Sequence, residues 1–168
     1  MTKVKYSFLH ASMQKIGSTR SGALIFSKMQ PHIDRLLLKL TRGKTNLTSL
    51  LSGLPVVLLT SKGAKSGLLR STPLMGIQDP PGTSKIALIA SNYGQGHHPA
   101  WYYNLKANPQ VTCTINGKQG KYFAYQAQGQ EYTRYWQAAT DLYLGFAQYQ
   151  LRAGDRHIPI MILDPVAE

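Results

Sequence analysis

The chain has 168 residues, of which 43% are hydrophobic and 10 are tyrosines. This length and composition predict one folded domain with a sizeable core and argue against a disordered chain. Lysine and arginine number 19 against 7 acidic residues, which gives a net charge of +12. Such an excess suits nucleic acid, an anionic membrane surface or an anionic ligand, and charge alone does not choose among them.

The single cysteine, Cys113, excludes a disulfide framework and a cysteine-based zinc site. No uncharged apolar stretch approaches the roughly 20 residues that a membrane-spanning helix needs. Residues 1–20 also lack the apolar core of a secretory signal. From these features we expect a cytoplasmic protein that is neither exported nor integral to a membrane.

Residues 1–44 are predicted to form a basic N-terminal arm, because they hold nine lysines or arginines against the single acid Asp34. Pro31 and Gly43 are typical first-turn and stop residues of a helix. Between them an apolar and a basic stripe run side by side at helical spacing: Ile33, Leu36, Leu37 and Leu40, and His32, Arg35, Lys39 and Arg42. Two interpretations of this amphipathic helix stay open. It packs on the domain with a solvated basic side, or it lies on an anionic membrane surface at the inner face of the cell membrane.

Residues 45–168 are predicted to form one domain in which strands dominate. The expected strands are Val56 to Thr60, Leu68 to Gln78, Lys85 to Ser91, Val111 to Ile115, Lys118 to Ala127 and Ile158 to Leu163. Asn116-Gly117 predicts a tight hairpin between the fourth and the fifth. One helix is expected from near Pro99 to Asn108-Pro109, and another from about Gly129 to Leu144. The fold class that follows is α+β, mainly β, with a six-stranded barrel and flanking helices.

The stretch "LLTSKGAKSGLLRSTPL", residues 58–74, joins two apolar runs through a connection that carries glycines and cations. The pattern predicts a β-hairpin in which Gly63 and Gly67 can take the positive φ that a turn needs. Lys62, Lys65 and Arg70 lie close together in the sequence, and no carboxylate occurs between Asp34 and Asp79. The connection therefore predicts a site for an anion.

Residue types that carry catalysis on their own are scarce. No serine lies in a G-x-S-x-G elbow, and Cys113 lies inside an alternating strand pattern rather than beside a basic partner. Adjacent His97 and His98 lack metal-ligand spacing, so no metal site is predicted. A chain rich in binding groups and poor in catalytic ones is typical of a protein whose cofactor supplies the reactive atom.

Three blocks taken in order resemble the deazaflavin-dependent nitroreductase and quinone reductase family. They are the 58–74 stretch, "IALIASNYGQGHHPAWYYNLKANPQV" and "RHIPIMILDP", and the resemblance covers about Leu54 to Pro165. It implies a split β-barrel of the flavin-reductase and pyridoxamine-oxidase type. It also implies a two-electron reductase that uses coenzyme F420, a 5-deazaflavin whose tail carries a phosphate and a chain of glutamates. Such a polyanionic tail would account for the unneutralised cations.

The resemblance also implies the residues that contact the cofactor. These are Lys65, Ser66, Gly67, Arg70, Thr72, Pro73, Ser91, Asn92, Trp101 and Asn104. Lys65 and Arg70 are expected to pair with phosphate and carboxylate oxygens, and Pro73 to face the deazaflavin ring. The chain departs from its relatives at Ala64, where many have a second cation, and at Asn92, where some have lysine. Both departures predict a weaker hold on the tail.

The family's substrate wall falls on "DLYLGFAQYQ", which offers Tyr143, Phe146 and Tyr149, with Met75 where an aromatic can occur. The expected acceptors are a quinone, an enone or a nitro compound, with low reactivity toward bulky nitroimidazoles. Tyr143 and Tyr149 are the catalytic candidates. Because an unperturbed tyrosine has a pKa of about 10, we expect them to donate hydrogen bonds to the acceptor oxygen before acting as acids.

Two alternatives to this function stay open at the level of sequence. A phosphate-binding hairpin on the same barrel would also serve an oxidoreductase that holds flavin mononucleotide (FMN). A basic barrel with exposed aromatics could instead bind single-stranded nucleic acid. The aromatics gather in the predicted helices rather than alternating with cations along strands, which argues against the second alternative.

Overall fold

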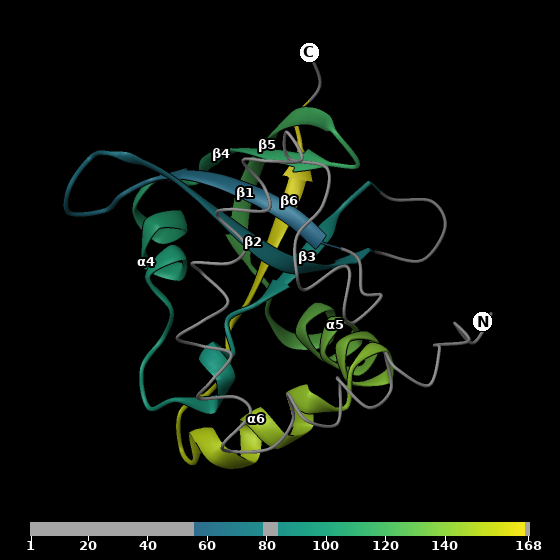
Figure 1. Ribbon diagram of the computed structural model, residues 1–168. Coiled ribbons are helices and arrows are strands. Elements are labelled where there is room, and N and C mark those ends of the chain that lie inside the picture. The colour runs from purple at the N-terminus through teal and green to yellow at the C-terminus, as the bar shows by residue number, and fades with distance from the viewer. Residues whose placement is uncertain (1–55, 79–83, 167–168) are drawn as a thin grey trace.

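The computed structural model describes residues 56–78 and 84–166 (Figure 1). In this part the elements are β1 (Val56–Lys62), β2 (Leu69–Gln78), β3 (Ile86–Ile89), the 3-10 turn η1 (Asn92–Gly94), α4 (Ala100–Ala107), β4 (Gln110–Ile115), β5 (Lys118–Gln126), α5 (Gly129–Leu142), α6 (Gly145–Ala153) and β6 (Ile160–Pro165). The strands close into a barrel in the order β1-β2-β3-β6-β5-β4. The predicted six-stranded barrel is therefore confirmed. The basic arm and its amphipathic helix lie outside the described residues.

Alternation along the strands decides which side chains enter the barrel. On β1, Val57, Leu59 and Ser61 are buried while their neighbours are more exposed, as the two-residue period of a strand requires. On β4 the same period buries Val111 and Cys113, and the Cys113 side chain has no exposed surface. Every strand pairs antiparallel with its neighbours.

The predicted hairpin between β4 and β5 is confirmed at its turn. Asn116 and Gly117 have φ values of 50° and 78°, the two positive φ angles that a two-residue hairpin loop of this type requires. The register of the hairpin follows, with Ile115 opposite Lys118.

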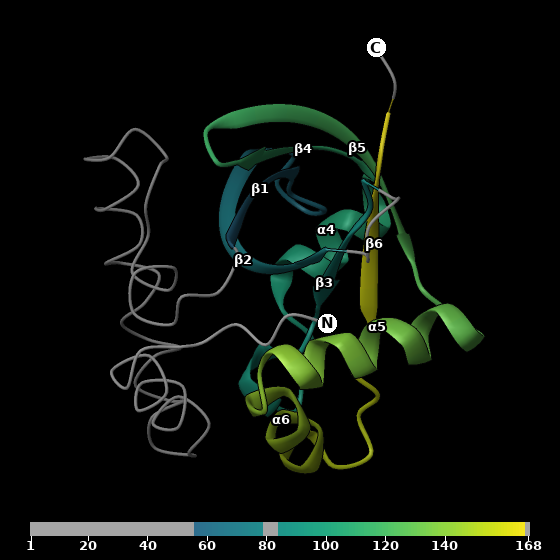
Figure 2. The same cartoon turned by 90° about the vertical axis from the view of Figure 1, so that its right-hand side faces the viewer.

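The core has two layers on the two faces of the sheet. One cluster lines the barrel and includes Trp101, Tyr102 and Leu105 of α4. The other lies on the outer face of β3 and β6, where α5 and α6 cover it. Figure 2 shows the ring of strands with these two helices beneath it. Both layers consist of apolar side chains removed from water, the main favourable contribution to folding.

The predicted helix from about Gly129 to Leu144 is confirmed as α5, which ends two residues earlier, whereas the helix that follows it was not predicted. Helix α5 ends at Leu142, Tyr143 takes an extended conformation (φ −147°, ψ 107°), and a second helix, α6, starts at Gly145. A Cβ atom on Gly145 would collide with the Tyr143 ring, so the close approach requires glycine.

None of the helices within residues 56–78 and 84–166 is long and apolar enough to cross a bilayer.

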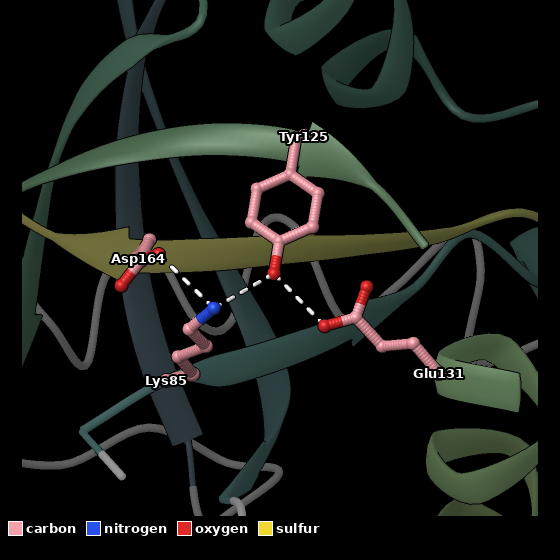
Figure 3. A network of polar contacts seen from close by, with 4 residues as sticks. All are labelled: Lys85, Tyr125, Glu131 and Asp164. Carbon is pink, nitrogen blue, oxygen red and sulfur yellow. Dashed lines mark hydrogen bonds and ion pairs between the residues drawn. The ribbon is translucent and has the colours of Figure 1, made fainter. Parts of the chain in front are cut away.

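A polar network ties α5 to the barrel (Figure 3). Lys85 Nζ donates to Tyr125 OH at 3.0 Å and pairs with Asp164 Oδ2 at 3.1 Å. Tyr125 OH in turn donates to Glu131 Oε1 at 2.9 Å. The hydrogen bond to Tyr125 and the ion pair with Asp164 raise the pKa of Lys85. One tyrosine hydroxyl thus links the start of β3 to the first turn of α5.

We expect Tyr125→Phe to lower the free energy of unfolding by about 1 kcal/mol, because two hydrogen bonds at a partly exposed site are lost while the ring remains. Urea denaturation measures this change. Tyr122→Phe is the matched control, since Tyr122 lies on the same strand and its hydroxyl makes no hydrogen bond to any described residue. Equal stability of the two variants would contradict a stabilising role of the network.

Candidate cofactor-binding site

The β1–β2 turn is closed by its own backbone. Gly63 N donates to Leu68 O and Gly67 N donates to Gly63 O, each at 2.9 Å. Gly67 has the predicted positive φ, 68°, whereas Gly63 does not. Space at Gly63 is limited by side chains of the turn, since a Cβ there would lie 2.6 Å from Ser66 Oγ and 3.7 Å from Arg70 Nε. The side chains of Ser66 and Arg70 therefore both lie close to the backbone of Gly63.

Helix α4 holds this turn in place. Ala64 N donates to Asn104 Oδ1 at 3.0 Å, and Asn108 Nδ2 donates to Lys62 O at 3.3 Å. Asn104 is buried, with 8% of its surface exposed. The structure thus places Asn104 against the turn rather than in solvent. Asn108, which was predicted only as a helix stop, is a second residue that holds the turn. Its only sequence signal is the four-residue spacing from Asn104.

The cations of the turn have no carboxylate partner among the described residues. Lys65 and Arg70 are exposed, in contrast to Lys85, which pairs with the carboxylate of Asp164. Lysine and arginine side chains beside a serine hydroxyl are donors that phosphate and carboxylate oxygens bind. This donor set fits the phosphate and glutamates of an F420 tail. Thr72 and Pro73 follow on β2, half-buried, where they pair with Leu59 and Leu58.

The segment that carries Ser91 and Asn92 leaves β3 in an unusual conformation. Asn92 and Tyr93 both have positive φ, 47° and 57°, which L-residues other than asparagine and aspartate seldom adopt. Gly94 N donates to Ser91 O at 3.0 Å, and Asn92 Nδ2 donates to His97 O at 3.0 Å. Ser91 is buried and Asn92 half-buried.

Trp101 lies in the cluster that lines the barrel, with 7% of its surface exposed. Its indole is therefore part of the core that supports α4. Any contact between Trp101 and a cofactor would use the small remainder of that surface.

The four residues predicted to contact substrate meet in one aromatic layer. Tyr143, Phe146 and Tyr149 belong to the buried cluster under α5 and α6, and Met75 packs against it. The rings of Tyr143 and Phe146 meet edge to face at 5.5 Å. The hydroxyls of Tyr143 and Tyr149 lie 3.1 Å apart, within hydrogen-bond distance. Burial raises the pKa of both tyrosines, so both hold their protons at neutral pH.

The structure holds the predicted cofactor residues in two groups. The turn residues are fixed to α4 through Asn104, and the Ser91–Asn92 segment is fixed to Arg156, which follows α6. Arg156 Nη2 donates to Ser91 O at 2.6 Å. Arg156 lies in the block "RHIPIMILDP", but the sequence alone predicts no role for it, because its partner Ser91 is 65 residues away. Within the described ranges no three His, Cys, Asp or Glu residues gather in a way that could hold a metal ion.

Comparison with known proteins identifies the family of the chain. The sequence model described as F420H(2)-dependent quinone reductase matches residues 34–165. Two relatives from strains of Mycobacterium tuberculosis, the F420H(2)-dependent quinone reductases Rv1261c and MT1299, are each 34% identical over 112 residues, 65% of this chain and 72% of theirs.

A solved structure, that of an F420-H2 dependent reductase (FDR-A), is similar with a TM-score of 0.58 and 40% identity, over 66% of this chain and 94% of that one. These comparisons give no support to FMN or to nucleic acid as a ligand. The match spans most of the chain and includes every strand, the β1–β2 turn and the segment held by Arg156. The chain belongs to the F420H(2)-dependent quinone reductase family.

Proposed function

We propose that the protein is a reductase that transfers a hydride from reduced coenzyme F420 to a quinone. The observation that carries the proposal is the β1–β2 turn, where Lys65 and Arg70 present exposed cations without a carboxylate among the described residues. The bound deazaflavin supplies the hydride, and the quinone takes up this hydride and one proton to become a hydroquinone.

The residues of the chain bind and orient. Lys65, Ser66 and Arg70 bind the anionic tail through charge-assisted hydrogen bonds. Asn104 and Asn108 fix the backbone of the turn that carries these donors, so little backbone freedom remains to be lost on binding. Pro73, half-buried on β2, offers an apolar surface to the ring.

Tyr143 and Tyr149 are the proposed contacts for the acceptor oxygen. Because burial raises their pKa, they act as hydrogen-bond donors that polarise the carbonyl, and solvent supplies the proton. Met75 and Phe146 pack in the same buried cluster, and we expect them to form the apolar wall against the flat ring of a quinone. The same wall accepts an enone or a small nitroaromatic, whose electron-poor carbon or nitro group is reduced in the same two-electron manner.

The test compares cofactors directly. Reduced F420 and reduced FMN are mixed in parallel with the wild-type protein and a water-soluble quinone, and reoxidation of each is followed by its visible absorbance. We expect protein-dependent turnover with F420 alone. Turnover with FMN alone would overturn the cofactor assignment, and F420 turnover with an enone but not with a quinone would overturn the acceptor.

A further inference from the structure

Arg156 lies between α6 and β6, and its guanidinium donates hydrogen bonds to the segment that follows β3. Nε donates to Gln95 O at 2.8 Å, Nη2 to Ser91 O at 2.6 Å and Nη1 to Ala90 O at 3.3 Å. The donors of a guanidinium point in fixed directions within one plane. Three backbone carbonyls are therefore held in one geometry by a single rigid group.

The segment that Arg156 holds needs such support. Asn92 and Tyr93 have successive positive φ values, each of which costs about 1 kcal/mol or more, and strained residues of this kind persist only when their surroundings fix them. The backbone here also packs closely, since a Cβ on Gly94 would lie 2.7 Å from Tyr149 O. Without the guanidinium, the carbonyls of Ser91 and Gln95 on either side of this strained turn would lose their shortest hydrogen bonds.

His98 completes the arrangement. Arg156 Nη1 lies 3.0 Å from His98 Nδ1. An arginine side chain only donates and stays charged, so Nδ1 must be the acceptor and the imidazole hydrogen must lie on Nε2. A protonated His98 would place two donors and two positive charges against each other.

The surroundings of His98 favour its neutral form. The imidazole packs on the rings of Tyr102 and Tyr103 of α4, with centroids at 4.8 and 6.0 Å. Burial lowers the pKa of His98, and the charges of Arg156, His157 and His97 lower it further. The charged groups that face this histidine are thus all cationic when protonated.

We propose that Arg156 is a positioning residue for F420 binding: it fixes the Ser91–Asn92 segment in the form that receives the cofactor, and it does so with neutral His98 as a partner. This inference rests on the proposed function, which puts Ser91 and Asn92 against F420. Arg156 itself acts through the backbone it holds.

The first test separates geometry from charge. F420 affinity is measured by tryptophan fluorescence for Arg156→Lys and Arg156→Ala, with Arg134→Ala on α5 as a control that removes the same charge at an exposed position. We expect both Arg156 variants to raise the Kd for F420 about 10-fold, since lysine keeps the charge but not the planar set of donors. The Kd of the control should stay within about 2-fold of the wild-type value. Wild-type affinity in Arg156→Lys would overturn the inference.

The second test uses pH and a variant that keeps an acceptor. In His98→Asn the amide oxygen can replace Nδ1 but does not titrate. Because the pKa of His98 is lowered from its ordinary value of about 6.5, its protonation lies below that value. As the pH falls from about 7.5 to about 4.5, we expect the affinity of the wild type for F420 to fall more than that of His98→Asn. The titration of the ligand is common to both proteins and cancels in the comparison. Equal pH profiles would overturn the role of neutral His98.

The third measurement needs no cofactor. Hydrogen exchange of the Gly94 and Gln95 N–H groups, which bond to Ser91 O and Asn92 O, should be faster in Arg156→Lys than in the wild type. Unchanged exchange overturns the inference while the proposed function stands, provided the wild type binds F420. A wild type that binds no F420 overturns the proposed function and the inference with it, even if exchange is faster in the variant.

Discussion

Replacing Lys65 and Arg70 together by alanine is expected to weaken F420 binding about 100-fold, and each single change about 10-fold. A charge-assisted hydrogen bond at an exposed site contributes about 1.5 kcal/mol, which corresponds to about one factor of ten in Kd. Because both side chains are exposed, the loss should shrink as salt concentration rises and screens the charges. Fluorescence titration of the wild type and the variants at low and moderate salt measures both effects.

Lys118→Ala is the control for this series, since Lys118 is an exposed lysine at the other hairpin of the barrel, between β4 and β5. It lowers the net charge by the same amount without touching the β1–β2 turn. If Lys118→Ala weakened binding as much as Lys65→Ala, the cations would act through net charge, and the turn would not be the binding site.

Gly94→Ala is expected to destabilise the protein by about 2–4 kcal/mol, the sum of a left-handed φ and an overpacked contact. Gly94 has φ 78°, and its Cβ would lie 2.7 Å from Tyr149 O and 2.8 Å from Arg152 Cβ. In a chain of this length such a loss lowers the Tm by about 5–15 °C. Thermal unfolding followed by circular dichroism measures it.

The matched control lies two residues along the chain. A Cβ on Gly96 would meet no atom within 4 Å, and Gly96 has no left-handed φ. Gly96→Ala should therefore leave the Tm unchanged or raise it slightly by restricting the unfolded chain. Equal losses at Gly94 and Gly96 would mean that helix α6 does not pack on η1 as described.

The barrel could be predicted from sequence because its signals are local. Alternation of apolar residues, as at Val111 and Cys113, marks a strand, and Asn116-Gly117 marks a hairpin wherever it occurs between two strands. Helix α6 was not predicted, although the helix before it was expected to end at about Leu144. Its N-cap position is occupied by Leu144, which makes no capping hydrogen bond, so the sequence carries no local signal for the start of a helix there.

The candidate site was predictable only in part, because some of its features are local in the sequence and others depend on tertiary contacts. Cations without carboxylates, such as Lys65 and Arg70, can be counted in a sequence, and the family resemblance supplied the residues around them. The supports of the site depend on tertiary contacts: Asn104 bonds to Ala64 at a separation of 40 residues, and Arg156 bonds to Ser91 at 65. No local pattern marks residues whose partners are set by the closure of the barrel.

The buried position of Cys113 bears on the chemistry of the proposed acceptor. Quinones are electrophiles that alkylate thiols, and the attacking species is the thiolate. Cys113 is the sole cysteine of the chain. Its side chain has no exposed surface, and burial raises the pKa of its thiol to about 12. A reductase of quinones thus keeps its one thiol protonated and inside the barrel, where its own substrate does not alkylate it.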